Sequence, residues 1–161
     1  MRPFIVICLS LTLACARPAA AGPHEDADVA YARGDYAAAL QIYRALAAQG
    51  LAPAQFNLGV MHDFGQGAER DPAAAVRWYR TAAAQGHAGA QFNLGGMYFE
   101  GTGVPQDTLR AHMWFTLAAI AGAPGASRNR SSIGRLLSPD ELARAQQMTR
   151  ECQARQFIGC D

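Results

Sequence analysis

Apolar residues recur along the chain at the spacing of a helix. Ala54, Leu58 and Met61 stand at i, i+4 and i+7, which places them on one face. After a short glycine-containing segment, a second run has the same character. Its apolar members are Ala75, Trp78, Tyr79, Ala82 and Ala83. The pattern predicts a helix, a short loop and a second helix.

This two-helix pattern occurs twice, because residues 54–86 reappear 36 positions later as residues 90–122. The first six positions of the two copies are identical. A period of this length indicates stacked units rather than a single globular core. We interpret these shared positions as structural: Leu58, Gly59, Gly65, Gly67, Asp71 and Trp78, with Leu94, Gly95, Gly101, Gly103, Asp107 and Trp114 in the second copy.

The types of these residues suggest what each does. Glycine tolerates the positive φ of a tight connection, so the two Gly-x-Gly segments are expected to end the first helix of each unit. Asp71 and Asp107 are expected to cap the second helix. Gly59 would let neighbouring helices approach closely. Trp78 and Trp114 are predicted to fill the space between units.

The flanking segments resemble modified copies of the unit, and Asn129 falls 36 residues after Asn93. Ser138 and Glu141 form the pattern of a capping box before a final helix. The predicted fold class is therefore all-α, an α/α solenoid of about four helix hairpins. Its expected parts are an N-terminal partial unit (24–53), two full repeats (54–89 and 90–125) and a C-terminal capping unit (126–161).

The first 21 residues have the pattern of a secretory signal peptide. Arg2 is followed by an apolar run over 4–14 and by small residues ending at 19–21. Cleavage is expected after position 21, with Ala16 as the second choice. A lipid anchor on Cys15 is the alternative to soluble export. The predicted location is periplasmic or secreted, with 22–161 as the solenoid domain.

Composition adds two constraints. The full chain has a formal net charge of +1. Proteins that bind nucleic acids usually carry a strong excess of basic residues, and this chain has none. Cys152 and Cys160 are the cysteines outside the predicted signal, and an even number in an oxidising compartment favours a disulfide. Free thiols or an intermolecular bridge remain open alternatives.

The repeat pattern Ala-x-x-x-Leu-Gly, Gly-x-Gly, Asp, Ala-x-x-Trp-Tyr and Ala-Ala-x-x-Gly resembles the Sel-one-like (Sel1-like) repeat family. The resemblance implies a solenoid similar to tetratricopeptide repeats, with adaptor or scaffold roles. A cysteine-rich secreted branch of the family bridges neighbouring helices through cysteines eight apart, the spacing of Cys152 and Cys160. Penicillin binding and weak β-lactamase activity are linked to that branch.

Candidate chemistry is sparse. The four histidines, His24, His62, His87 and His112, show no metal-binding spacing, and the chain has no lysine for a Ser-x-x-Lys mechanism. We therefore predict no catalytic residue, metal or cofactor.

Four polar residues at equivalent helical positions are candidates for binding: Gln55, Asn57, Gln91 and Asn93. Such residues can form a row along the concave face of a solenoid, although a hydrogen-bond ladder or plain solvated surface is the alternative. The favoured function is a non-enzymatic module that binds a peptide or protein segment, with no nucleic acid and no membrane span after signal cleavage. A cell-wall-active enzyme and a periplasmic regulator of a sensor kinase are the alternatives.

Overall fold

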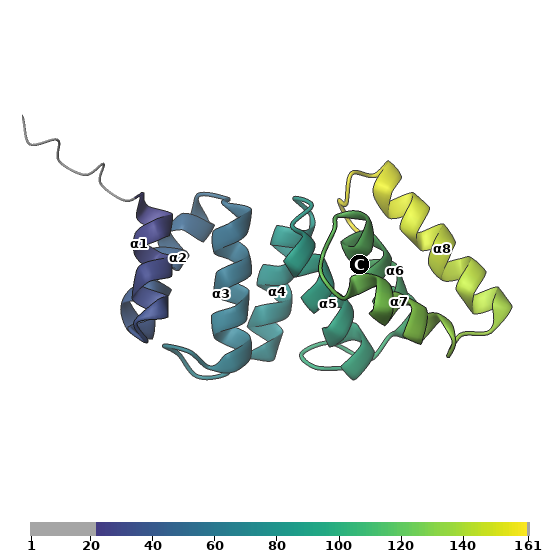
Figure 1. Cartoon of the computed structure of the whole chain (residues 1–161), viewed down its shortest axis with the longest axis horizontal. Coiled ribbons are helices and arrows are strands. Elements are labelled where there is room, and N and C mark those ends of the chain that lie inside the picture. The colour runs from purple at the N-terminus through teal and green to yellow at the C-terminus, as the bar shows by residue number, and fades with distance from the viewer. Residues whose placement is uncertain (1–21, 161) are drawn as a thin grey trace, which may run out of the picture.

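Between residues 22 and 160, eight α-helices follow one another along the longest axis of the molecule (Figure 1). This computed structural model describes residues 22–160, so the predicted signal peptide and Asp161 lie outside it. No strand occurs within that range. The helices are α1 (Pro23–Ala32), α2 (Tyr36–Ala48), α3 (Ala52–Phe64), α4 (Pro72–Ala83), α5 (Ala88–Glu100), α6 (Thr108–Ile120), α7 (Ala126–Gly134) and α8 (Pro139–Ala154). The predicted all-α solenoid is confirmed.

The first six helices form three hairpins that pack in order. Within each hairpin α1 contacts α2, α3 contacts α4 and α5 contacts α6, and each hairpin then packs on the next. In every hairpin a ring pair between the two helices includes the equivalent position 43, 79 or 115. These pairs are His24–Tyr43, Phe56–Tyr79 and Phe92–Phe115, with ring centroids 5.9, 5.9 and 5.3 Å apart. The first hairpin has an additional pair, Tyr31–Tyr36. The repeated sequence thus produces a repeated aromatic contact.

The predicted caps are present at the second helix of each hairpin. The carboxylate of Asp71 accepts a hydrogen bond from the backbone N–H of Ala74 at 2.8 Å, and Asp107 accepts one from Arg110 at 2.9 Å. Asp35 does the same at the start of α2. These side chains satisfy backbone donors that have no partner within the helix.

Each Gly-x-Gly loop joins the two helices of one hairpin and contacts the hairpin before it. Gly65 and Gly101 end α3 and α5 in the left-handed conformation. Gly67 and Gly103 also have positive φ, and a Cβ on Gly103 would lie 2.4 Å from the carbonyl oxygen of Pro72. The loop therefore rests directly on the N-terminal turn of the preceding second helix. Only glycine leaves room for that contact.

Small residues inside the hairpins allow close helix packing. A Cβ on Gly59 would lie 2.7 Å from the ring of Tyr79, and a Cβ on Gly95 would lie 3.1 Å from the ring of Phe115. Each glycine thus makes space for the aromatic residue of the partner helix, as the sequence predicted.

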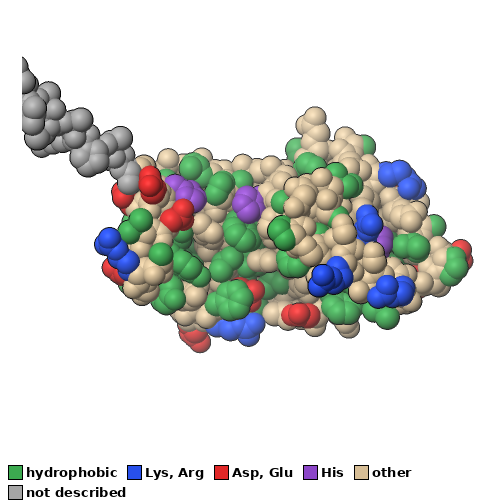
Figure 2. All heavy atoms as spheres, in the orientation of Figure 1, with side chains coloured by type: hydrophobic (Ala, Val, Ile, Leu, Met, Phe, Trp, Pro, Cys, Tyr) green, Lys and Arg blue, Asp and Glu red, His purple; other side chains and the backbone are tan. Residues whose placement is uncertain are grey.

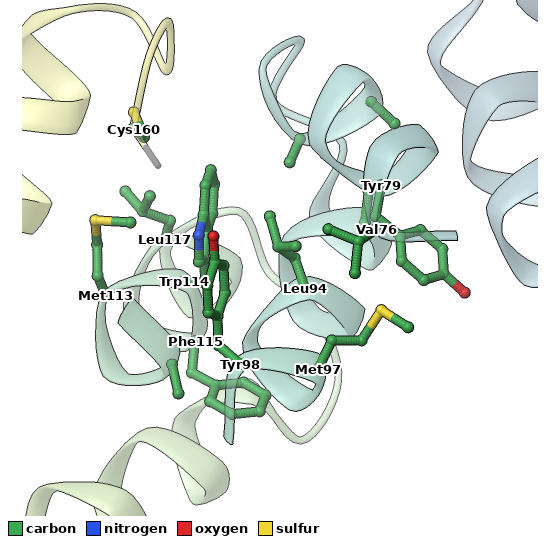
Figure 3. Packing of buried hydrophobic residues seen from close by; sticks show 14 of the residues in the cluster. Val76, Tyr79, Leu94, Met97, Tyr98, Met113, Trp114, Phe115, Leu117 and Cys160 are labelled. Carbon is green, nitrogen blue, oxygen red and sulfur yellow. The ribbon is translucent and has the colours of Figure 1, made fainter. Parts of the chain in front are cut away.

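The two tryptophans of the repeat differ in burial. Trp114 is 2% exposed and lies within the large core cluster, beside Leu94, Tyr98 and Leu117 (Figure 3). Trp78 is only half-buried and packs at the edge of the smaller N-terminal cluster. The difference arises because α8 and the C-terminal tail contribute to the cluster around Trp114, whereas α4 has no such cover.

The last two helices depart from the regular hairpin. Ser138 and Glu141 form the predicted capping box at the start of α8. However, α8 packs on α6 instead of pairing closely with α7 (Figure 1). The helix therefore closes the end of the solenoid as a cover over α6.

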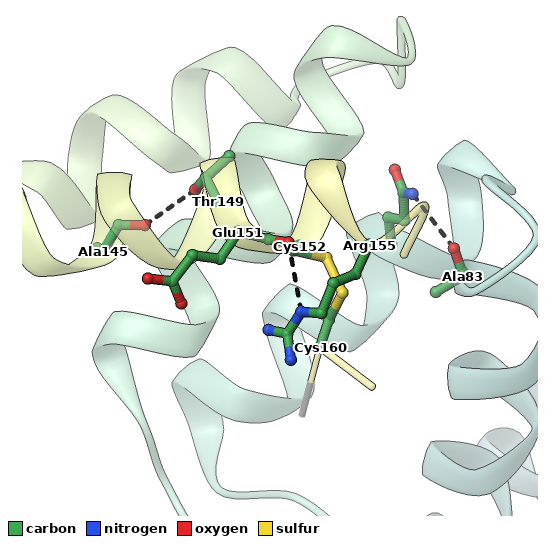
Figure 4. Close-up of a disulfide and its surroundings, with 8 residues drawn as sticks. Ala83, Ala145, Thr149, Glu151, Cys152, Arg155 and Cys160 are labelled. Atoms are coloured by element: carbon green, nitrogen blue, oxygen red, sulfur yellow. Dashed lines mark hydrogen bonds between the residues drawn. A yellow bond between two sulfur atoms is a disulfide. The ribbon is translucent and has the colours of Figure 1, made fainter. Parts of the chain in front are cut away.

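A disulfide joins Cys152 on α8 to Cys160 in the tail that follows (Figure 4). Both cysteines are buried, and both belong to the large core cluster. The bridge therefore holds the tail against the core that contains Trp114.

Replacing Cys160 with serine is expected to lower the free energy of unfolding by about 2–3 kcal/mol. The bridge restricts the unfolded chain, and the short loop that it closes sets this size. Urea denaturation of the oxidised protein, the reduced protein and the variant measures the effect. The variant should be insensitive to reductant, and an unchanged midpoint on reduction of the native protein would contradict this role.

Candidate functional site

The three asparagines of the chain stand at one position of successive units. Asn57, Asn93 and Asn129 are 36 residues apart, and there is no other asparagine. They lie on α3, α5 and α7, and each side chain is half-buried. The first two were predicted as binding candidates from their equivalent positions in the repeat. The third was noted for its spacing, and the same criterion would have selected it.

Each of the first two asparagines lies next to a tyrosine of the preceding helix. Asn57 is close enough to the hydroxyl of Tyr43 to influence its pKa, and that hydroxyl donates a hydrogen bond to Asp28. Asn93 is close enough to Tyr79 to influence its pKa, but the geometry falls short of a hydrogen bond, which leaves that buried hydroxyl unsatisfied. Burial raises the pKa of both tyrosines above the ordinary value, so both hydroxyls stay protonated.

The third asparagine has a different neighbour. Position 115, equivalent to the two tyrosines, is a phenylalanine and offers no hydroxyl. Within the described part of the chain, the Asn129 side chain forms no hydrogen bond. Its amide keeps a donor and an acceptor for a ligand.

A groove runs along the last two members of this row, Asn93 and Asn129. Its main part has a volume of about 450 Å³ and includes Phe92, Asn93 and Asn129. A second hollow of about 340 Å³ continues from it past Leu136. The two hollows share Gly96, Glu100, Phe115 and Asn129. We call the combined feature the asparagine groove. A separate hollow of about 260 Å³ contains Asn57.

Exposed apolar side chains border the asparagine groove. Phe64 is 68% exposed, Leu136 is 66% exposed and Phe99 is 36% exposed. Figure 2 shows hydrophobic side chains gathered over α3 on the face turned to the viewer. Neighbouring exposed apolar side chains of this size are typical of a contact surface for another molecule.

Three charged side chains lie at the same groove. Asp63 is paired with Arg70, with 3.5 Å between carboxylate and guanidinium. Glu100 is exposed and forms no ion pair with any described residue. The groove thus presents one carboxylate that a ligand can neutralise.

The structure corrects the placement of the two glutamines. Gln55 and Gln91 are 6% and 1% exposed, so they are not part of an open surface. The side-chain amide of Gln55 donates to the carbonyl of Ala47, and that of Gln91 donates to the carbonyl of Ala83. Both amides satisfy backbone acceptors at the end of the preceding helix, which explains their burial.

The histidines occupy separate structural positions. His87 caps α5 through its Nδ1, which accepts a hydrogen bond from the backbone N–H of Ala90, and its ring stacks on Phe56. Among residues 22–160, no group of three or more His, Cys, Asp and Glu side chains is placed to hold a metal ion. Burial lowers the pKa of His62, His87 and His112 below the ordinary value.

These lowered histidine pKa values predict a loss of stability in acid. The unfolded chain binds protons near pH 6.5, whereas the folded chain binds them only at lower pH. The free energy of unfolding should therefore fall as the pH drops below about 6.5. Urea denaturation at pH 7.5 and 5.5 measures the change. His87→Asn should retain the cap and show a smaller change, while a native protein that is more stable at pH 5.5 would contradict the prediction.

None of the described helices is both long enough and apolar enough to span a bilayer.

Comparison with known proteins supports this architecture. A family model described as the Sel1 repeat matches residues 52–87 and 88–122. Both matches begin two residues before the repeat bounds that we expected, and they end two and three residues before them. No curated protein matches the chain.

Two solved structures are similar to it. One is a protective antigen present in uropathogenic Escherichia coli strains that displays an SLR fold, with 27% identity and a TM-score of 0.78 over 84% of this chain and 31% of that chain. The other is a Sel1 repeat protein from Oxalobacter formigenes, with 33% identity and a TM-score of 0.63 over 67% of this chain and 43% of that chain. The chain therefore spans less than half the length of either protein.

Sel1 repeat proteins generally mediate protein–protein interactions and are typically non-enzymatic scaffolds. The present chain combines two matched repeats, the helix order of the solenoid and the similarity to two solved repeat structures. The chain therefore contains two Sel1 repeats within a helical solenoid that is similar to solved Sel1 repeat proteins.

Proposed function

We propose that the asparagine groove binds a segment of a partner protein and that the protein acts as a non-enzymatic interaction module. The observation that carries this proposal is the asparagine row, since one amide per unit lines a hollow on the same face of the solenoid. Repeated polar groups beside a groove suit a ligand that itself repeats, and a polypeptide backbone is such a ligand.

The chemistry of the groove favours a peptide. An asparagine amide carries donors and an acceptor that match a peptide group. Phe64, Phe99 and Leu136 offer apolar contacts for side chains of the ligand. Gly96 has no atom within 4 Å of the place where its Cβ would be, so a ligand can approach the backbone of α5 there.

The charge of the groove suggests one feature of the partner. Glu100 lacks an ion-pair partner among the described residues and lines both parts of the groove. A segment with apolar residues and an arginine or lysine that reaches Glu100 would neutralise this carboxylate. Ion pairing of this kind adds mainly to specificity and to the rate of association.

We also propose that this interaction takes place in the bacterial envelope. The export pattern of residues 1–21 and the bridge between Cys152 and Cys160 support that location, because structural disulfides persist in oxidising compartments.

The test is selection of peptides on the purified, oxidised protein, followed by binding to a groove variant. Peptides selected from a random displayed library should bind the native protein. Their affinity for the double variant Asn93→Ala/Asn129→Ala should be at least about tenfold lower, which corresponds to about 1.4 kcal/mol of binding free energy. The matched control is Gln41→Ala, which removes an exposed amide from α2. Its affinity should stay within about twofold of the native protein.

Two results would contradict the proposal. One is a set of selected peptides that bind the groove variant as tightly as the native protein. The other is equal loss in the control variant, since that would show an effect unrelated to the groove. Circular dichroism of all three proteins verifies that they are folded.

A further inference from the structure

A pocket separate from the asparagine groove lies on the other side of α7, where α8 departs from the regular hairpin. Because α8 packs on α6, a pocket of about 360 Å³ remains between α6, α7 and α8. On α7 and its C-cap, the pocket is lined by positions 130, 131, 134 and 135, whereas the asparagine groove uses positions 129, 132, 133 and 136. The two sites thus occupy neighbouring stripes of one helix.

The pocket is positively charged and has no acidic lining residue. Arg130 and Arg135 both line it, together with Ser131 and Gln146 as further hydrogen-bonding groups. Arg130 forms no hydrogen bond or ion pair with another described residue, and Arg135 donates only to the hydroxyl of Ser132, at 3.3 Å. Arginine side chains in Figure 2 gather over the half of the molecule that holds α7. Two guanidinium groups therefore face one hollow without a carboxylate between them.

A buried histidine completes the pocket. His112 lines it from α6 and is 5% exposed. Its Nδ1 is buried and has no hydrogen-bond partner, although a buried polar atom normally has one. Its Nε2 lies 3.5 Å from the place where a Cβ on Gly134 would be, so the ring stands close to α7. Arg130 is near enough to disfavour the charged form of this imidazole.

We propose that this pocket binds a single oxyanion group, a carboxylate or a phosphate, between Arg130 and Arg135. The planar guanidinium group donates two parallel hydrogen bonds to either kind of group. An anion in the pocket would also offer an acceptor to the imidazole of His112. The proposal is independent of peptide binding in the asparagine groove.

Inorganic phosphate and acetate are the two probes, each titrated into the full-length oxidised protein at constant ionic strength with chloride as the balancing ion. Amide NMR spectra should show saturable shifts at α7 and the facing part of α6. The Arg130→Gln/Arg135→Gln variant should bind at least about tenfold more weakly. The matched control is Arg128→Gln, an exposed arginine of the same helix that does not line the pocket.

Saturable binding of only one probe would identify that chemistry as the ligand class. Absence of saturation with both probes, or equal weakening in Arg128→Gln, would overturn the proposal, because the effect would then be general charge screening. If the double variant is unfolded, the single change Arg135→Gln at the exposed position provides the same comparison.

Discussion

Replacing Trp114 with alanine is expected to lower the free energy of unfolding by about 3–5 kcal/mol. Its indole is 2% exposed and packs where α5, α6 and the disulfide-bound tail meet. A loss of this size is a large part of the total stability of a small domain, which is typically about 5–15 kcal/mol. Urea denaturation followed by circular dichroism measures it, because that signal does not depend on tryptophan fluorescence.

The equivalent change at Trp78 is the internal control. This residue has the same place in the repeat but is only half-buried, so its truncation should cost no more than about half as much. Equal losses in the two variants would show that the C-terminal cover over Trp114 adds nothing to stability.

Replacing Gly103 with alanine is expected to have the second largest effect. Two penalties combine at this position, since the residue has a φ of +70° and its Cβ would lie 2.4 Å from the carbonyl oxygen of Pro72. The backbone of α4 must shift to admit the methyl group. Overpacking of this kind costs about 1–3 kcal/mol in addition to the cost of the left-handed conformation.

Gly122→Ala separates these two penalties. Gly122 has a φ of +82°, but no atom lies within 4 Å of its Cβ position. It should therefore show the conformational cost alone, and Gly103→Ala should be about 1–3 kcal/mol less stable in urea denaturation. If both variants lose the same free energy, the loop does not depend on close contact with the preceding unit.

The local features of the fold could be predicted because they depend on short stretches of sequence. Asp71 and Asp107 cap their helices, Ser138 and Glu141 form the capping box, and Gly59 makes room for an aromatic ring. Each of these roles is determined within one helix or one hairpin, where spacing and residue type are sufficient.

The features that were missed depend on contacts between units. Gln55 looked like a surface residue because it is polar, yet it reaches a carbonyl at the end of the preceding helix. Trp78 and Trp114 have the same repeat position and differ only because α8 covers one of them. The packing of α8 on α6 follows from how the array ends, which a repeat pattern does not encode.

The candidate site was predicted only in part, because the sequence repeat identifies equivalent positions but not the irregular packing at the end of the array. Asn57 and Asn93 were selected from their spacing, and both line hollows of the structure. The pocket around His112 could not be predicted, since it exists only where α8 leaves the regular arrangement. Repetition locates a row of equivalent side chains, whereas an irregular end creates a site that has no copy elsewhere in the chain.

The central claim is that the partner occupies the asparagine groove, and site-specific photo-crosslinking in living cells tests it most directly. A photoreactive residue at position 96 lies in the groove, and one at the exposed position 77 on α4 lies outside its lining. We expect an adduct with a partner protein from position 96 that disappears when Asn93 and Asn129 are changed to alanine, and none from position 77. The same adduct from both positions, or an adduct at position 96 that persists without the two asparagines, would contradict the claim.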